Sequence, residues 1–241
     1  MFKNIELSVI APALNEEGNL ELLAKRTLNV FNKLRVKGEL IVINDGSTDR
    51  TPDVLNSLSK KYNNIAKITH AKNRGIVESW KSGLKKARGK YVVTIDSDLQ
   101  YLPEDIEFLY KKITNSNTDV VQAARFQSEE PYGIRQILSL ALKAVLNTIF
   151  SLKLDDPKSG FVIYKKEAFK DILNYRNKYH YFQHLITVAA KAKGYKILQI
   201  NVKFARRHSG KSFLANFPLK FIINAIIDLY NAKREFKIIK K

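Results

Sequence analysis

Two aspartates, Asp96 and Asp98, stand two positions apart directly after the apolar stretch Lys90–Ile95. In an Asp-x-Asp loop, two hard carboxylate oxygens can bind Mg²⁺ or Mn²⁺, which keeps its remaining positions for water and substrate phosphates. Gln100 offers a further oxygen on the same side of an extended loop. A metal bound there would hold a diphosphate and stabilise it as a leaving group. The spacing therefore predicts chemistry on a diphosphate-bearing substrate.

Two further polar clusters follow apolar runs in the same way. Residues 15–17, Asn-Glu-Glu, come shortly after Leu7–Ala11, and residues 44–47, Asn-Asp-Gly-Ser, come directly after Glu39–Ile43. Taken singly, such clusters have ordinary explanations, because an Asp-Gly pair favours a turn and Ser47 can cap a helix. Three acid-rich clusters at successive strand ends favour one shared site, because a parallel sheet brings its carboxyl ends to one edge, where ligands bind.

The elements that must position these clusters alternate between strand and helix over the first 125 residues. Strands separated by helices of roughly 10–15 residues are typical of a mostly parallel sheet with helices on both faces. The sequence thus predicts an α/β fold. We expect strands at Leu7–Ala11, Glu39–Ile43, Ile65–Thr69, Lys90–Ile95 and Asp119–Ala123. We expect helices at Asn19–Leu34, Thr51–Tyr62, Ile76–Ala87 and Glu104–Ile113.

The composition excludes several classes of protein and of site. Hydrophobic residues make up 45% and charged residues 27% of the 241 residues, an ordinary globular mixture. Disorder, collagen and coiled coil therefore do not describe the chain as a whole. There is no cysteine, which excludes disulfides, cysteine-ligated zinc and thiol catalysis. The four histidines show no metal-binding spacing, which disfavours a histidine zinc site.

The chain is strongly basic, and the excess charge lies mostly in its second part. Lysine and arginine total 42 against 23 acidic residues, a formal net charge of +19. Residues 1–130 carry 20 basic and 17 acidic side chains, whereas residues 131–241 carry 22 and 6. A solvated lysine-rich surface explains such an excess, and so does binding to nucleic acid, to an anionic membrane or to a phosphate-bearing substrate. Composition does not choose among these partners.

Two amphipathic segments lie in this basic part. Ile134–Phe150 is apolar around most of its circumference, and at 1.5 Å per residue it spans roughly 25 Å, too short to cross a bilayer. Its polar residues recur every four positions and form one helical stripe: Arg135, Ser139, Lys143 and Asn147. Either the helix is buried with this stripe toward solvent, or it lies at a bilayer interface with the stripe toward the active site. Phe217–Tyr230, followed by basic residues, is a similar segment.

No secretory signal or transmembrane helix is expected. The N-terminus lacks a long apolar stretch and a cleavage site, and no run of about 18 uncharged apolar residues occurs. We therefore expect a cytoplasmic protein. In the interpretation that places the amphipathic segments at a bilayer interface, it lies peripherally on the inner face of the membrane.

Three ordered motifs resemble those of the family 2 glycosyltransferases, over about residues 7–213. They are residues 11–17 (Ala-Pro-Ala-Leu-Asn-Glu-Glu), 44–51 (Asn-Asp-Gly-Ser-Thr-Asp-Arg-Thr) and 96–100 (Asp-Ser-Asp-Leu-Gln). Within that family the chain resembles the polyprenol-phosphate branch, typified by dolichol-phosphate mannosyltransferase. The cues are the Asp-x-Asp-Leu-Gln form, Asp-Pro-Lys-Ser-Gly-Phe at 156–161 and Arg-His-Ser-Gly-Lys-Ser at 207–212. The resemblance implies a GT-A fold with a mostly parallel sheet flanked by helices, here with C-terminal amphipathic helices.

The resemblance also implies how the matching residues bind the donor. A UDP- or GDP-linked sugar would be bound by Pro12, Asn15, Glu16, Glu17, Asp45 and Asp96. Asp45 would contact the base or the ribose, and Asp96 would face the nucleotide. Mg²⁺ or Mn²⁺ would be bound by Asp98 and Gln100, with Asp96 in support.

The resemblance and the polar stripe together predict an acceptor site. Arg125 matches the family's arginine after the last sheet strand. Arg135 and Ser139 lie one helical turn apart, so a guanidinium and a hydroxyl can reach one phosphate together. Their matching positions in dolichol-phosphate mannosyltransferases are implicated in binding the acceptor phosphate. Arg207 resembles part of the mobile loop that closes over the donor, and we predict catalytic roles for Asp98, Arg125 and Arg207.

The chain departs from the family pattern where a catalytic base would lie. In the helix expected near Tyr181–Ala192, the position that is often acidic in this branch is Leu185, with His184 beside it. Gln199 likewise stands where Glu is usual. A phosphate acceptor is already an anion at pH 7 and needs no base. The departures therefore favour a phosphate acceptor over a sugar hydroxyl.

We therefore predict a metal-dependent hexosyltransferase that transfers a sugar, with inversion, from a nucleotide diphosphate to a dolichyl or undecaprenyl phosphate at an anionic membrane surface. A soluble family 2 transferase acting on a saccharide is the alternative. Nucleic acid is not an expected partner, because no recognition helix or RNA motif is present. The sugar, the nucleotide, the lipid length and the oligomeric state stay open.

The expected organisation is one GT-A domain with a short appendage. The domain would cover residues 1–213, with a nucleotide-sugar half at about 1–125 and an acceptor half at about 126–213. A basic amphipathic extension would follow at 214–241.

Overall fold

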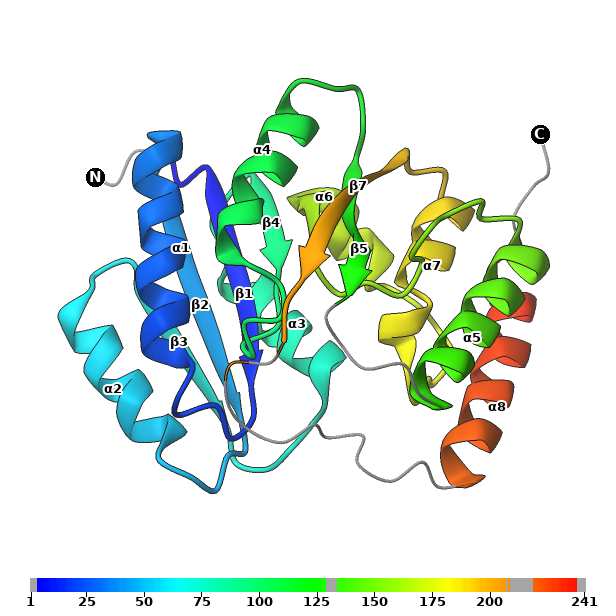
Figure 1. Ribbon diagram of the computed structural model, residues 1–241, viewed down its shortest axis with the longest axis horizontal. Coiled ribbons are helices and arrows are strands. Elements are labelled where there is room, and N and C mark those ends of the chain that lie inside the picture. Colours follow the sequence, from blue (N-terminus) through cyan, green and yellow to red (C-terminus); the bar gives the residue numbers. More distant parts are fainter. Residues whose placement is uncertain (1–3, 129–133, 207, 209–218, 238–241) are drawn as a thin grey trace.

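The structure is a computed structural model, and it describes residues 4–128, 134–206, 208 and 219–237 of the chain. Side chains are described in these ranges except at 127–128, 134–139 and 219–221. One central sheet is covered by helices on both faces, as Figure 1 shows. The predicted α/β fold class is therefore confirmed.

The described residues form a seven-stranded sheet in the order β3-β2-β1-β4-β6-β5-β7. Within it, β6 runs antiparallel to both of its neighbours, and the other pairings are parallel. The strands are β1 Leu7–Ala13, β2 Gly38–Asp45, β3 Ile65–His70, β4 Tyr91–Thr94, β5 Val120–Ser128, β6 Val162–Lys165 and β7 Ile197–Phe204. The five predicted strands are confirmed, with differences only at their ends.

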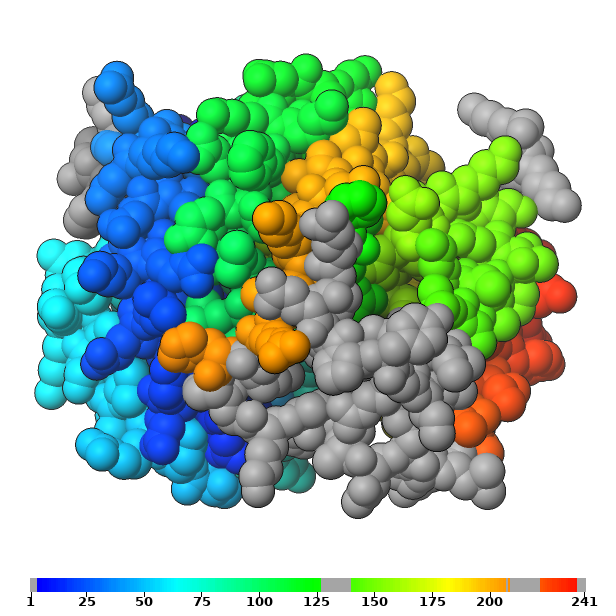
Figure 2. Space-filling model, viewed as in Figure 1, coloured from blue at the N-terminus to red at the C-terminus, as the bar shows by residue number. Residues whose placement is uncertain are grey.

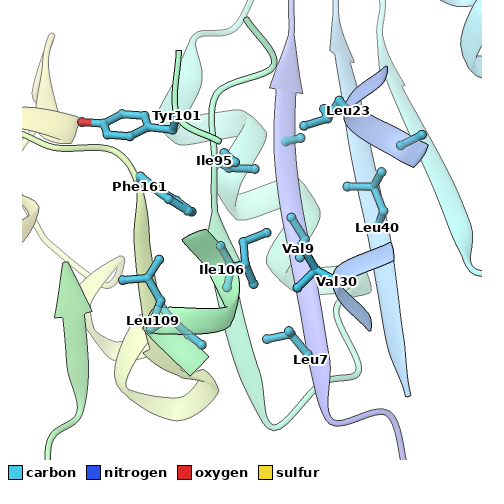
Figure 3. Packing of buried hydrophobic residues seen from close by; sticks show 14 of the residues in the cluster. Leu7, Val9, Leu23, Val30, Leu40, Ile95, Tyr101, Ile106, Leu109 and Phe161 are labelled. Atoms are coloured by element: carbon cyan, nitrogen blue, oxygen red, sulfur yellow. The ribbon is translucent and has the colours of Figure 1, made fainter. Parts of the chain in front are cut away.

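The helices divide between the two faces of the sheet. They are α1 Leu20–Leu34, α2 Thr51–Lys61, α3 Ile76–Lys86, α4 Ile106–Thr114, α5 Ile134–Phe150, α6 Lys166–Ile172, α7 Ile186–Ala192 and α8 Leu219–Glu235, with short 3₁₀ turns η1 Pro103–Asp105 and η2 Phe182–His184. One core lies under α1, α2 and α4, where Leu23, Leu40 and Ile106 pack together (Figure 3). The other lies under α3 and α5–α8 and includes Trp80 and Leu146.

The sequences of the inner strands are continuous apolar runs, because both faces of each strand are buried. Val9 and Ile10 are neighbours in β1 yet belong to opposite cores, since successive side chains of a strand alternate. Val42 and Ile43 in β2 divide in the same way. Full burial of each such side chain contributes about 1.5–3 kcal/mol, so the sheet is firmly held below the site.

Strand β6 is not among the predicted elements, and it changes the geometry of the site. It lies between β4 and β5, and its first residue, Val162, pairs with Thr94 near the end of β4. Because β6 runs in the reverse direction, it begins at the edge where its neighbours end. The Thr94 hydroxyl donates to the carbonyl oxygen of Gly160 at 2.7 Å. The loop before β6 therefore lies beside the loop that follows β4.

The two amphipathic segments are both helical. Helix α5 has the predicted bounds, and α8 runs to Glu235, beyond the predicted end at Tyr230. In α8, the Asp228 carboxylate accepts from the backbone N–H of Tyr181 at 2.7 Å, and Glu235 accepts from the Tyr179 hydroxyl at 2.8 Å. Two carboxylates thus attach α8 to the loop before η2. The predicted domain limit at residue 213 lies outside the described residues and stays a prediction.

Candidate active site

The loops that follow β1 and β2 are joined to each other by hydrogen bonds. The Asn15 N–H donates to the Ser47 hydroxyl at 2.9 Å, and the Thr48 N–H donates to the Asn15 side-chain oxygen at 2.8 Å. Asn15 adopts a left-handed backbone with φ 57°, a conformation that asparagine tolerates better than most residues. The Glu16 N–H donates to the hydroxyl of Thr51 at 2.8 Å. The segments that follow β1 and β2 therefore form one unit.

The remaining residues of these loops extend that unit. The Glu17 carboxylate accepts from the Arg50 N–H at 2.7 Å. At the end of β1, the carbonyl oxygen of Pro12 accepts from the Ser97 hydroxyl at 2.7 Å. The structure thus brings the three predicted strand-end clusters together at one edge of the sheet, as their positions in the sequence indicated.

The Asp45 carboxylate, at the end of β2, is buried and is already well supplied with donors. It contacts His70 Nδ1 at 2.6 Å, and it accepts from the backbone N–H groups of Arg74 and Gly75 at 2.9 and 2.8 Å. His70 Nε2 in turn lies 2.9 Å from the Ser82 hydroxyl. Asp45 therefore holds the loop between β3 and α3 against the end of β2.

That loop, residues 71–75, is a part of the site that sequence reasoning missed. Gly46 has φ 77°, and a Cβ added there would lie 2.5 Å from the backbone nitrogen of Asn73. Only glycine allows this close approach of the two loops. The signal in the sequence was the Asn73-Arg74-Gly75 turn before a helix, which follows the third strand as the other clusters follow theirs.

The Asp-x-Asp loop turns sharply after β4. Leu99 has φ 62°, a strained value for leucine, and it separates Asp98 from Gln100. Both of these side chains are 6% exposed. The Gln100 N–H donates to Asp98 Oδ1 at 3.1 Å, and the Gln100 carbonyl oxygen accepts from the Ala205 N–H at 2.9 Å. The two polar side chains, which the sequence predicted on an extended loop, are thus buried on a sharp turn.

The oxygen donors of this loop fit a hard divalent cation. The described residues contain no group of three or more His, Cys, Asp or Glu side chains arranged to hold a metal. Mg²⁺ and Mn²⁺ do not need such a group, because one or two carboxylates suffice when substrate phosphates complete the coordination. A buried carboxylate on a strained, well-bonded turn is suited to that role, and Asp98 is the residue that best meets this description.

Arg125 lies inside β5, where it pairs with Val202 of β7, rather than after the strand as predicted, and it is fixed by Asp156 in the loop before β6. Arg125 Nε lies 2.6 Å and Nη2 lies 3.0 Å from the two carboxylate oxygens of Asp156. Burial would raise the pKa of Asp156, but the hydrogen bonds and charge of Arg125 hold that pKa below its usual range. The guanidinium also lies 5.3 Å from the ring centre of Phe204. Arg125 is thus oriented from two sides.

The polar stripe of α5 faces the same loop at its C-terminal end. The Asn147 amide donates to the Leu154 carbonyl oxygen at 2.9 Å and accepts from the Leu154 N–H at 3.2 Å. This contact favours the sequence interpretation in which the stripe is turned toward the site. Arg135 and Ser139 lie on that stripe in the helix backbone, and their side chains are outside the described residues, as is Arg207.

The residue after Arg207 is described, and it bridges two of the loops. The His208 N–H approaches the Asp98 carbonyl oxygen at 3.4 Å, and His208 Nδ1 lies 3.2 Å from the Asn19 side-chain oxygen. His208 thus lies beside both the Asp-x-Asp loop and the start of α1. In Figure 2, the orange part of the chain, near residue 200, lies against the blue N-terminal part.

The positions where the family has acidic residues contribute no carboxylate here. Leu185 is buried, and Gln199 holds the loop before β6 by accepting from the Asp155 N–H at 2.6 Å. The buried His184 Nδ1 has no hydrogen-bond partner among the described residues, and burial, followed by the charge of Lys158, lowers the His184 pKa to about 4. His184 is therefore neutral at pH 7.

Helices α5 and α8 lie side by side (Figure 1), and both expose apolar side chains. The exposed large residues are Leu140, Val145 and Ile149 on α5 and Ile222, Ile223, Ile226, Ile227 and Tyr230 on α8. No helix among the described residues is both long enough and apolar enough to cross a bilayer. Exposed apolar surface of this extent on neighbouring helices marks a contact surface.

Comparison with known families gives one clear match. A family model described as "Glycosyl transferase family 2" matches residues 8–173. An undecaprenyl-phosphate 4-deoxy-4-formamido-L-arabinose transferase of Photorhabdus laumondii is 28% identical over 225 residues, which is 93% of this chain and 66% of that protein. A dolichyl-phosphate beta-glucosyltransferase of Trichomonas vaginalis is 28% identical over 83% of this chain and 66% of its own length. The chain thus spans slightly less than two thirds of these relatives.

Solved structures show the same fold. Glucosyl-3-phosphoglycerate synthase of Mycobacterium tuberculosis, in complex with UDP, superposes with a TM-score of 0.70 at 20% identity, covering 96% of this chain and 81% of that one. Another structure of that synthase contains Mn²⁺, UDP and glucosyl-3-phosphoglycerate, and it superposes with the same score. At this level of identity the likeness shows the fold alone, and that fold is the predicted GT-A type.

Proposed function

Since the chain belongs to glycosyl transferase family 2, we propose that it transfers a sugar, with inversion, from a nucleotide diphosphate sugar to a polyprenyl phosphate. The observation that carries the proposal is that the acceptor side offers an oriented cation and has no carboxylate at the two positions where the family has acidic residues. Arg125 is oriented there by Asp156, while Leu185 and Gln199 supply no carboxylate. Such a site suits an acceptor that is already an anion. Relatives that act on undecaprenyl and dolichyl phosphates support the same acceptor class.

In this proposal the interlocked loops after β1 and β2 bind the donor. Pro12, Asn15, Glu16 and Glu17 line the nucleotide pocket, and Asp96 faces the nucleotide. Asp45 has its carboxylate engaged by His70 and by two backbone N–H groups. It therefore acts partly by fixing the loop 71–75 next to the base and ribose.

Asp98 and Gln100, supported by Asp96, would hold Mg²⁺ or Mn²⁺, which neutralises charge on the departing diphosphate when bound. The buried Asp98 carboxylate and the strained Leu99 fix the direction of these oxygens before the donor arrives. That fixed arrangement lowers the reorganisation needed during the reaction.

Arg125, Arg135 and Ser139 would hold the acceptor phosphate, and Arg207 would close over the donor. An acceptor phosphate oxygen attacks the anomeric carbon from the side opposite the nucleotide, and the bond from that carbon to the donor diphosphate breaks. No proton has to be removed from the acceptor, so the chain needs no base. The cations of the site counter the repulsion between the two phosphate groups.

The same proposal places the protein peripherally on the inner, cytoplasmic face of a membrane. Ile226 on α8 is 60% exposed, and the helix ends in Lys233 and Arg234. Apolar residues can enter the lipid interface while nearby basic residues attract anionic lipid, at about 1 kcal/mol for each well-placed charge. The face of α5 and α8 is the surface that would carry the contact.

The second candidate function is transfer to a saccharide away from the membrane. One experiment separates it from transfer to a polyprenyl phosphate. Purified protein with Mg²⁺ or Mn²⁺ is supplied with a panel of UDP- and GDP-sugars and either farnesyl phosphate or a mixture of free saccharides. We expect a glycolipid from one donor with farnesyl phosphate. Product formation on saccharides alone would replace the proposed function with the second candidate.

A further inference from the structure

His70 connects the end of β2 to helix α3 through two hydrogen bonds. Its Nδ1 lies 2.6 Å from Asp45 Oδ1, and its Nε2 lies 2.9 Å from the Ser82 hydroxyl. Asp45 and His70 are partners in the register of β2 and β3, and they are 4% and 7% exposed. Gly83, next to Ser82, lets α3 approach the sheet, because a Cβ there would lie 2.6 Å from Ile10 Cγ2. The three polar groups therefore have fixed places.

The direction of both hydrogen bonds follows from the carboxylate. Asp45 also accepts from the backbone N–H groups of Arg74 and Gly75, one on each oxygen. An ionised carboxylate can only accept, so the hydrogen between Asp45 and His70 belongs to Nδ1. In the neutral imidazole, Nε2 is then the acceptor, and the Ser82 hydroxyl donates to it. A directed chain of hydrogen bonds thus runs from Ser82 through His70 to Asp45.

These donors leave the two oxygens of Asp45 unequal. Oδ1 accepts from His70 and from Arg74, which uses both of its lone pairs. Oδ2 accepts from Gly75 alone among the described residues, so one acceptor position remains on it. A ligand N–H or O–H that reaches this carboxylate is therefore received by Oδ2. Rotation of the carboxylate would exchange the two oxygens, and the hydrogen bond from His70 opposes that rotation.

The order of these three groups is also that of a serine hydrolase triad. Such a triad needs further donors that are placed to stabilise an oxyanion. Ser82 lies in the interior of α3, where backbone N–H groups donate to carbonyl oxygens one turn earlier. At the other end of the chain, Asp45 is the last residue of β2, next to the loop that Ser47 joins to Asn15. The arrangement is therefore suited to orient Asp45 and not to a nucleophilic Ser82.

We propose that His70 is a positioning residue, which orients the Asp45 carboxylate for binding the nucleoside part of the donor. The inference rests on the proposed nucleotide-sugar donor and adds to it a residue outside the motif positions assigned above. His70 need not touch the donor, because its Nδ1–H acts through the carboxylate. A hydrogen bond to a charged acceptor is roughly twice as strong as one between neutral groups. Without it, Oδ2 should point toward the donor for a smaller fraction of the time.

The test compares His70→Asn, His70→Gln and His70→Phe, which retain different parts of the imidazole. Asparagine carries its amide nitrogen at the position of Nδ1, glutamine can place its own near Nε2, and phenylalanine has neither. Calorimetry on the full chain with Mg²⁺ measures the affinities for UDP, GDP and inorganic diphosphate, which has no base or ribose. His180→Phe is the matched control, because His180 Nδ1 also contacts a carboxylate, that of Asp228 on α8, at 3.1 Å. Thermal unfolding shows that each variant is folded, and His70→Gln replaces His70→Phe if the latter is not.

We expect His70→Phe and His70→Gln to weaken binding of the nucleotide that the wild type prefers, UDP or GDP, by about tenfold, because neither variant has a donor at Nδ1. His70→Asn should stay within about threefold of wild type, because its amide N–H replaces Nδ1–H and needs no tautomer to be set. The affinity for diphosphate should stay within about twofold in every variant, since this probe has no nucleoside for Asp45 to bind. His180→Phe should match wild type with all three probes.

Equal nucleotide affinities of wild type and His70→Phe would overturn the inference. Parallel losses of nucleotide and diphosphate affinity would also overturn it, because a general loosening of the site would then explain both. The inference would fail as well if His70→Asn lost as much nucleotide affinity as His70→Phe, since the Nδ1–H group would not be what matters. These three outcomes leave the proposed function intact. If the wild type binds neither UDP nor GDP, the proposed function fails at its donor, and the inference fails with it.

Discussion

The guanidinium of Arg125 and the carboxylate of Asp156 form a two-point ion pair, with nitrogen to oxygen distances of 2.6 and 3.0 Å. The pair connects β5 to the loop before β6, and its two residues are 31 positions apart in the chain. It fixes the plane of the guanidinium, which a single contact would leave free to rotate. In the proposed acceptor site, the orientation of Arg125 therefore depends on a carboxylate that need not touch the substrate.

Replacing Asp156 by asparagine should disturb that orientation. We expect the acceptor KM to rise by about tenfold and the free energy of unfolding to fall by about 1–3 kcal/mol, because a mostly buried ion pair loses one charge. Steady-state kinetics and urea unfolding measure the two effects. Asp155→Asn, at the exposed neighbouring residue, is the control. Unchanged kinetics in Asp156→Asn would show that Arg125 does not depend on this partner.

Metal dependence should reside in Asp98. Asp98→Asn keeps an oxygen that can accept from the Gln100 N–H, so the fold should persist although this carboxylate is buried rather than on the surface. We expect the loss of most activity, by about a hundredfold or more, and an equal loss in wild type when EDTA is in excess. Asp53→Asn, on the exposed face of α2, should behave as wild type. Full turnover in EDTA would contradict the proposed metal role.

His184 should matter for stability at low pH and not for chemistry. Its folded pKa of about 4 lies below the ordinary value of 6.5, so the unfolded state takes up a proton first as the pH falls. Wild type should therefore lose stability between about pH 6.5 and pH 4, and His184→Leu should lose less in that window. The stability that Asp156 contributes is lost at lower pH, because its carboxylate is protonated only as the pH falls through a pKa held below 3.8.

The kinetic part of the His184 prediction is equally specific. Turnover of His184→Leu on farnesyl phosphate should stay within about threefold of wild type, since a phosphate acceptor needs no base. Abolished chemistry in a variant that still folds and binds both substrates would identify His184 as the base and would undermine the proposed acceptor class.

Arg135 is expected to contact the acceptor phosphate from the stripe of α5. Arg135→Lys keeps the charge but loses the bidentate fork, so use of polyprenyl phosphate should weaken by at least about tenfold, or about 1.4 kcal/mol. The donor KM should barely change. Arg206→Lys is the control, because Arg206 is an exposed residue just after β7. An unchanged acceptor KM and kcat in Arg135→Lys would remove Arg135 from the site.

Membrane attachment should depend on the exposed apolar face of α8. Ile226→Glu should reduce co-flotation with anionic vesicles by about tenfold, because a charge replaces a side chain that would enter the lipid. Phe108→Glu is a matched control, since Phe108 on α4 is also 60% exposed. High salt should weaken wild-type binding by screening the basic residues. Salt-insensitive behaviour without affinity for lipid would favour the saccharide transferase.

The sequence by itself determined the local elements and the strand-end clusters. Apolar runs such as Leu7–Ala11 and Lys90–Ile95 predicted strands, because residues buried on both faces of a sheet leave a local signature. Asp98 and Gln100 were identified from spacing alone. Their meeting with residues 15–17 and 44–47 followed from one general rule, that parallel strands end at the same edge. These features depend on neighbours in the chain.

The tertiary structure decided what lies opposite those clusters. The reversed strand β6 brings Asp156 to the site, and the short apolar run that forms it has too little periodicity to reveal its direction. His70 reaches Asp45 only because β2 and β3 are paired, and Asn147 shows the direction of the α5 stripe only through its contact with Leu154. Pairings between distant segments depend on how whole surfaces pack, which no local pattern in the sequence records.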